Sequence, residues 1–161
     1  MTALRPDRTP ALAFVEVSTE DPRSVELISE VQAVYADLYG SPDDSPMAAH
    51  EFEPPSGTFL VVLSANGRPI GCIGVRRHEE RVGEIKRMYV RPEHRRRGYA
   101  RALLVAAEDR ARELGYTALV LETGEPQPEA MALYEGHGYR RIPGFGHYQC
   151  APLSKSFRRE L

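Results

Sequence analysis

The sequence contains only two cysteines, Cys72 and Cys150, and no tryptophan. Two cysteines provide neither a zinc-binding set nor a disulfide framework. Cys72 lies within an apolar run, which indicates a buried, reduced thiol. The histidines are scattered without the spacing of a ligand set. We therefore expect no metal site.

Long apolar runs are also missing. None approaches the roughly 20 residues that cross a bilayer, and the N-terminus lacks the apolar block of a secretory signal. We therefore expect a cytoplasmic protein with no membrane partner. The net charge of −2 carries no basic excess and argues against a nucleic-acid partner. Basic residues nevertheless cluster at Arg76-Arg77 and at Arg95-Arg96-Arg97, and the first pair is also compatible with a solvated surface.

The composition that is present suits a single globular domain. The 161 residues are 42% hydrophobic and 27% charged, which is enough to bury a core. Neither an internal repeat nor a linker divides the chain. We expect one domain over residues 1–161.

Periodicity and turn residues predict the order of the elements. Apolar positions three or four apart indicate helices over residues 24–39 and 98–114, and Pro128 suits the first turn of a third helix that ends at Gly136 or Gly138. Asn66-Gly67 is typical of a hairpin between two strands. The expected strands cover residues 11–18, 58–64, 68–77, 84–91, 118–122, 139–142 and 154–159. Residues 41–56 are proline-rich and predict a long loop with room for a short helical turn. The order β-α-β-β-β-α-β-α-β-β predicts an α/β fold with a mixed sheet covered by helices.

The stretch from Val90 to Ala100 joins a strand to a helix through a basic, glycine-containing turn. A helix N-terminus has unpaired backbone N–H groups and the positive end of the helix dipole, and both attract phosphate oxygens. Gly98 allows close approach of the backbone, and the arginines add positive charge. An ordinary strand-to-helix connection with exposed arginines is the alternative interpretation.

Two motifs carry a resemblance to a known family. Arg95-x-x-Gly98-x-Ala100, directly after a strand, resembles the coenzyme A signature of the GNAT superfamily of N-acetyltransferases. Downstream, Gln127-x-x-Ala130-x-x-Leu133-Tyr134 is similar to the second coenzyme segment of that superfamily. The order of elements matches along essentially the whole chain.

The resemblance implies a mixed, mostly antiparallel sheet with helices on both faces, splayed between the strands at 84–91 and 118–122. It implies acetyl-CoA as cosubstrate, with the pantetheine arm in the split and the pyrophosphate on the turn at 95–101. Gln127 stands where many family members have Asn, a departure that puts its coenzyme contact in doubt. The residues expected to contact the coenzyme are Met88, Tyr89, Val90, Arg95, Arg96, Arg97, Gly98, Tyr99, Ala100, Arg101, Gln127 and Tyr134.

Acetyl transfer to an amine needs a proton donor for the departing thiolate. Family members commonly use a tyrosine at the position of Tyr134 as this acid. A phenol has a reference pKa near 10, so it is protonated and able to donate at pH 7. A core tyrosine is the alternative interpretation.

The amine must also lose a proton. By resemblance to the histone-acetylating branch, Glu84 is the candidate base, since burial raises the pKa of a carboxyl group. A salt bridge with Lys86, on the same strand face, is the alternative role for Glu84. Glu122, across the split, and a water relay are the competing routes for the proton.

The acceptor pocket is expected, by resemblance, between the first helix with its loop and the C-terminal hairpin. Aromatic and polar side chains there suit a small amine or amino-acid-like acceptor: Tyr35, Tyr39, His50, Phe52 and the segment 145–148. The alternatives are a protein or peptide N-acetyltransferase and a non-catalytic CoA-binding sensor module. A homodimer, common among relatives, is compatible with the sequence.

Overall fold

The computed structural model describes residues 12–161, within which seven strands form one sheet in the order β1-β2-β3-β4-β5-β7-β6. The strands are β1 (Ala13–Glu16), β2 (Thr58–Leu63), β3 (Pro69–Glu79), β4 (Val82–Val90), β5 (Ala118–Gly124), β6 (Arg140–Ile142) and β7 (Ser154–Glu160). The α-helices are α1 (Pro22–Tyr39), α2 (Tyr99–Glu113) and α3 (Pro128–Gly136), with short 3-10 turns η1 (Ala49–Phe52) and η2 (Pro92–His94). None of the helices in this part of the chain is long and apolar enough to cross a membrane.

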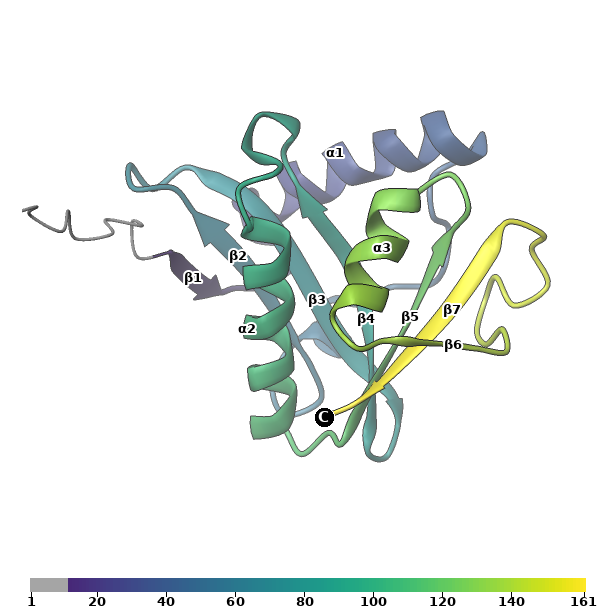
Figure 1. Ribbon diagram of the computed structural model, residues 1–161. Coiled ribbons are helices and arrows are strands. Elements are labelled where there is room, and N and C mark those ends of the chain that lie inside the picture. Colours follow the sequence, from purple (N-terminus) through teal and green to yellow (C-terminus); the bar gives the residue numbers. More distant parts are fainter. Residues whose placement is uncertain (1–11) are drawn as a thin grey trace, which may run out of the picture.

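Helices cover both faces of the sheet (Figure 1). On one face α2 and α3 pack on the larger core, where Leu103, Leu104 and Phe157 are fully buried. On the other face α1 packs against the middle strands, with Leu27 and Val31 against Phe59 and Val61. Each face of the sheet therefore has its own hydrophobic core.

The pair β4–β5 is the parallel pair of the sheet, and the other neighbouring strands are antiparallel. Val82–Ile85 pairs with Ala118–Leu121, and the pairing stops there although both strands continue. Just beyond, β4 bulges against β3 at Arg87, which has a φ of 57°. A bulge adds an unpaired residue and bends its strand. The sheet is therefore splayed between β4 and β5, as expected from the resemblance.

Local signals explain where the helices begin and end. Asp21 caps α1 by accepting a hydrogen bond from the backbone N–H of Arg23 at 2.9 Å, and Pro22 occupies the first turn. Gly40 then ends the helix in the left-handed conformation at φ 83°.

The predicted order of elements is confirmed, and the differences lie at element ends. The strand expected over 11–18 is only Ala13–Glu16, and residue 11 lies outside the described residues. Helix α1 begins two residues earlier than expected, because Asp21 provides the cap. Strand β5 extends to Gly124, because β7 pairs with it along its whole length. The helical turn expected in the loop at 41–56 is η1.

Candidate active site

A cavity of about 380 Å³ opens where β4 and β5 separate. It is lined by residues 85–88 of β4, residues 121–123 of β5, the C-terminal part of α1 with residues 41–43, one face of α3, Tyr148 and residues 151–154. Its volume is in the range of small-molecule sites. The splay of the sheet thus produces a site between segments that are far apart in the sequence.

Tyr134 reaches this cavity from α3. The residue is only 6% exposed, and its ring packs against Tyr139 and Phe157 with ring centroids 5.7 and 6.3 Å away. Its hydroxyl donates to Sδ of Met88 at 3.4 Å. Burial raises the pKa of Tyr134, so the phenol stays protonated at neutral pH. Because a thioether is a weak acceptor, this hydroxyl is available to a stronger one.

Glu122 lines the cavity one residue past Leu121, the last residue of β5 that pairs with β4. Burial, together with the negative charge of Glu84, raises the pKa of Glu122 to about 7. Gly146 passes so close that a Cβ atom there would lie 2.7 Å from Oε1 of Glu122. A carboxyl group with this pKa exchanges protons readily near neutral pH.

Glu84 lies outside the lining of the cavity. Glu84 lies opposite Arg76 on the neighbouring strand, and Nε of Arg76 donates to Oε1 of Glu84 at 2.8 Å. Glu84 is 7% exposed. The salt bridge weighed as the alternative role of Glu84 therefore exists, but with Arg76 as the partner. Lys86 instead contacts Asp43 at 3.0 Å.

Asp43 anchors the loop after α1 to the sheet. Its carboxylate accepts hydrogen bonds from Lys86, Arg87, Ser45 and the hydroxyl of Tyr148. Burial would raise the pKa of Asp43, but Lys86, Ser45 and Arg87 together outweigh it and hold this pKa well below its usual range. Asp43 was not among the candidates predicted from the sequence, since an acidic residue in a proline-rich loop belongs to no motif. Its partners lie more than 40 residues away along the chain, except for Ser45.

The expected acceptor residues divide into two groups. Tyr35, Tyr39 and Tyr148 line the cavity, whereas His50, Phe52 and Phe145 do not. Phe52 is 1% exposed and packs edge-on to Phe59. Phe145 packs beside His78 with ring centroids 4.9 Å apart. Next to Tyr148, His147 contacts Asp44 at 2.8 Å, which ties the loop before β7 to the loop after α1.

Gln127, the departure from the family pattern, also lines the cavity. Its side-chain amide donates to the hydroxyl of Tyr39 at 2.8 Å. The same hydroxyl lies so close to Gly124 that a Cβ atom there would be 2.4 Å away. Gln127 therefore connects the start of α3 to the end of α1.

The turn before α2 has the features of an anion site. Gly98 precedes the helix at φ 82°, and no side chain caps the helix N-terminus. The first N–H groups of a helix have no intrahelical partners. Apart from the chain neighbours of Gly98, no described residue has an atom within 4 Å of the position of a Cβ atom there, so this part of the structure leaves the space beside the turn open.

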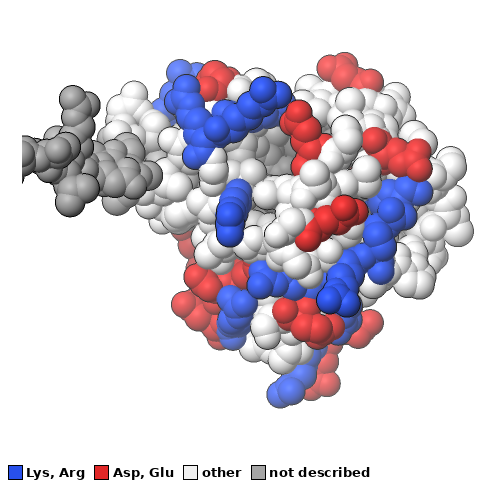
Figure 2. Space-filling model, viewed as in Figure 1, with Lys and Arg blue, Asp and Glu red and all other residues white. Residues whose placement is uncertain are grey.

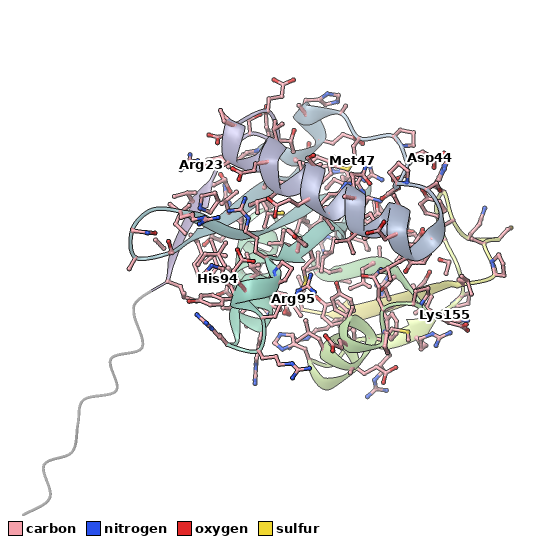
Figure 3. The ribbon with its side chains drawn as sticks, turned by 90° about the horizontal axis from the view of Figure 1, so that it is seen from above. Arg23, Asp44, Met47, His94, Arg95 and Lys155 are labelled. Atoms are coloured by element: carbon pink, nitrogen blue, oxygen red, sulfur yellow. The ribbon has the colours of Figure 1, made fainter. Side chains whose placement is uncertain are left out.

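The basic side chains around this turn have different roles. Arg95 donates from Nε to the carbonyl oxygen of Val90 at 3.0 Å and lies over the ring of Tyr89, although the residue as a whole is exposed. Arg96, Arg97 and Arg101 are exposed as well. Figure 2 shows Lys and Arg side chains gathered over this turn. In Figure 3 Arg95 and His94 lie together beside the start of α2, while Asp44 lies near the far end of α1.

The structure brings the two sequence motifs together. Arg96 of the first approaches Glu129, at the start of α3, to 4.0 Å. Of the other expected coenzyme contacts, Met88 lines the cavity, Val90 is buried in the core, and Tyr89 directs its hydroxyl to Glu30. Tyr99 and Ala100 are half-buried against the core under the turn.

Arg91 has a structural role that the sequence did not reveal. Its side chain is only 4% exposed and binds Glu26 and Glu30 of α1. It also donates to the carbonyl oxygen of Pro69 at 2.8 Å. These contacts direct its charge toward α1 rather than toward the turn.

Comparison with known proteins gives concordant matches. The family model for the acetyltransferase (GNAT) family matches residues 24–139. A protein of Azospirillum brasilense named IAA acetyltransferase is 34% identical over 91% of this chain and 98% of its own length. YjgM, an uncharacterized N-acetyltransferase of Escherichia coli, is 30% identical over 81% of this chain and 85% of its own length.

Solved structures agree. A Klebsiella pneumoniae protein assigned as an acyl-CoA N-acyltransferase superposes with a TM-score of 0.81 and 32% identity, over 94% of this chain and 98% of its own. A GNAT acetyltransferase of Elizabethkingia anophelis, solved with acetyl-CoA bound, shares the fold with a TM-score of 0.68 and 17% identity, over 94% and 99% of the two chains. The splayed sheet, the cavity and these matches together establish that the chain belongs to the GNAT family and is an N-acetyltransferase.

Proposed function

We propose that this protein transfers the acetyl group of acetyl-CoA to the amine of a small molecule, and that residues 1–161 form a single N-acetyltransferase domain. The observation that carries the proposal is the position of Tyr134 and Glu122 in one cavity at the splay of the sheet. One is a protonated phenol and the other a carboxyl group with a pKa of about 7. Such a pair can serve as the acid and the base in acetyl transfer to an amine.

The residues present fit acetyl-CoA, which supplies an acetyl group activated as a thioester. The exposed arginines at 96, 97 and 101 and the uncapped N-terminus of α2 suit the pyrophosphate. The β4 edge from Lys86 to Val90 is not paired with β5, so its backbone groups on that side suit the amides of a pantetheine arm. Relatives of the same fold solved with acetyl-CoA support this assignment.

Glu122 accepts the proton of the incoming ammonium group. Its pKa of about 7 leaves a substantial fraction ionised at neutral pH. We propose Glu122 for this role in preference to Glu84, because Glu84 lies outside the cavity and is paired with Arg76. Glu84 acts on the reaction by raising the pKa of Glu122.

Tyr134 holds the proton for the departing sulfur. Its hydroxyl already contacts a sulfur atom, Sδ of Met88, and burial keeps it protonated. A thiolate is a stronger acceptor than a thioether, so the hydroxyl has a better partner once the thiolate forms.

The size of the cavity supports a small acceptor. Two loops approach each other over it, joined by the Tyr148 contacts with Asp43 and Asp44. Tyr35 and Tyr39 provide aromatic surface on the α1 side. An extended peptide would need these loops to separate, so a small amine is the simpler acceptor.

Two measurements test the proposal. Acetyl-CoA or CoA should raise the melting temperature of the purified protein far more than ATP or NAD does, because a ligand of the folded state stabilises it by mass action. A screen of small amines with acetyl-CoA should then release free thiol. No thermal stabilisation by millimolar CoA would overturn the coenzyme assignment. Stabilisation without thiol release for any amine would favour a binding module.

A further inference from the structure

Lys86 and Arg87 are neighbours on β4, and both line the cavity. Their side chains are 11% and 4% exposed, and both contact the same carboxylate oxygen, Oδ2 of Asp43. Two buried cations therefore share one anion.

Among residues 12–161, no other residue that lines the cavity fully compensates the second cation. The charged residues that line the cavity are Asp43, Lys86, Arg87 and Glu122. Glu122 is protonated in a large fraction of molecules at neutral pH because its pKa is about 7. Glu84 is committed to Arg76 at 2.8 Å. When Glu122 holds its proton, two positive charges face one negative charge.

The donor groups of the two cations are also incompletely used. The ammonium of Lys86 contacts Asp43 at 3.0 Å and Ser45 Oγ at 2.8 Å, which leaves one of its three N–H groups. Nε of Arg87 is buried and has no hydrogen-bond partner among the described residues. Buried charges without partners are costly, so the surplus positive charge and the remaining N–H group of Lys86 indicate that an anionic group binds beside Lys86.

We propose that Lys86, supported by Arg87, binds a carboxylate of the acceptor, so that the acceptor is a small amine that also carries a carboxylate, as an amino acid does. This inference rests on the proposed function. When Glu122 takes the ammonium proton and becomes neutral, the acceptor is left with one negative charge. That charge matches the surplus cation, so the site is balanced at the moment when the amine is reactive.

The two ends of such an acceptor have separate partners. Glu122 lies on β5 and takes the amine, whereas Lys86 lies on β4 and takes the carboxylate. The split between the strands separates the two partners. Tyr35, Tyr39 and Tyr148 are then left to contact the rest of the molecule.

The test compares L-amino acids with their amides as acceptors. Each amide keeps the amine and the side chain and loses only the carboxylate. For acetylated amino acids, kcat/KM should exceed that of the matching amide by about 10- to 100-fold, the range of a charge-assisted hydrogen bond. Lys86→Met should bring this ratio close to one, and Lys86→Arg should keep it well above one.

Lys155 provides the matched control, because it is the only other lysine in the sequence. It lies on β7, outside the lining of the cavity, and contacts Glu125 at 3.1 Å. Lys155→Met should leave the ratio unchanged. Thermal stabilisation by CoA, measured for every variant, reports whether the fold and the coenzyme site survive.

The outcomes separate this inference from the proposed function. A ratio near one in the unaltered protein, or one that survives in Lys86→Met, would overturn the carboxylate site. Acetylation only of amines that lack a carboxylate would also overturn the carboxylate site, but it would leave the proposed function standing. Stabilisation by CoA without turnover of any amino acid counts against this acceptor class. If Lys86→Met fails to fold, the ratio of kcat/KM for amino acid to that for amide is compared in the unaltered protein and in Lys86→Arg. A ratio near one in either protein would overturn the carboxylate site. Absence of both stabilisation and thiol release would count against the proposed function.

Discussion

The hydroxyl of Tyr134 donates to Sδ of Met88 at 3.4 Å, and this contact joins α3 to the bulged part of β4 across the splay of the sheet. The hydroxyl that we propose as proton donor to the departing thiolate of CoA therefore already contacts a sulfur atom. The ring centroids of Tyr134 and Tyr139 are 5.7 Å apart. The hydroxyl of Tyr139 is buried and has no hydrogen-bond partner among the described residues.

These two tyrosines give a matched pair of variants. Tyr134→Phe should lower the single-turnover rate of acetyl transfer by roughly 10²- to 10⁴-fold, the range for loss of an acid catalyst. Coenzyme affinity should change little, because the exposed arginines and the N-terminus of α2 remain. Tyr139→Phe should keep full activity and equal or higher stability, since it removes a hydroxyl without a partner.

Single-turnover measurement is needed because slow product release would hide a chemical defect. Full activity of a folded Tyr134→Phe protein would return this residue to a packing role. Equal losses in both tyrosine variants would point to altered packing of α3 instead of a lost proton donor.

Substitutions of Glu122 and Glu84 should affect the pH dependence of the acetyl-transfer rate differently. With Glu122 as base, the rate rises with pH through about 7 as the carboxyl group ionises. Glu122→Gln should remove this rise together with most of the rate. Glu84→Gln should keep the rise and move it to lower pH, because removing the negative charge of Glu84 makes ionisation of Glu122 easier. If only Glu84→Gln loses the rise of the rate with pH, Glu84 is the base. If both variants keep this rise, a water relay is favoured.

The raised pKa of Glu122 also has a consequence for stability. A carboxyl group whose pKa rises from 4.5 to about 7 on folding stabilises the folded state in its protonated form and destabilises it when ionised. The unaltered protein should therefore lose stability, relative to Glu122→Gln, as the pH rises from about 4.5 to 7. Denaturant melts of both proteins at several pH values measure the difference. A constant difference across this window would contradict the raised pKa.

The anion site can be tested with two glycines of equal strain. Gly98 and Gly115 flank α2 with φ of 82° and 94°, and neither has an atom within 4 Å of a Cβ position. Valine at either site is strained by the left-handed backbone and should cost on the order of 1–3 kcal/mol. Gly98→Val should in addition reduce the thermal stabilisation by CoA, and Gly115→Val should not. Equal stabilisation of both variants would move the phosphate site away from this turn.

The order of the elements and most of their ends follow from local signals. Helix α2 illustrates this: its apolar face was predicted from spacing, and Gly98 and Gly115 mark its ends in the structure. The prediction that β4 lies beside β5 depended on the resemblance to the family, since pairing between strands far apart in the sequence has no local signal.

The electrostatics of the site were less predictable. Glu84 and Lys86 were expected to share a strand face, but their partners, Arg76 and Asp43, come from other elements. The choice between Glu84 and Glu122 likewise depends on which side chain borders the cavity, and burial decides that. Charge pairs of this kind are fixed by the folded backbone, so a linear pattern gives only the candidates.

The central claim is that an acetyl group passes from acetyl-CoA to the nitrogen of a small amine. The most direct measurement incubates the protein with acetyl-CoA labelled with ¹³C in the acetyl group and a pool of small amines, and then follows the label by mass spectrometry. The account predicts a labelled N-acetyl product formed in equal amount with free CoA, and roughly 10²- to 10⁴-fold slower formation by Glu122→Gln. Release of CoA with the label recovered only as acetate, or label on a protein side chain and on no small molecule, would contradict it.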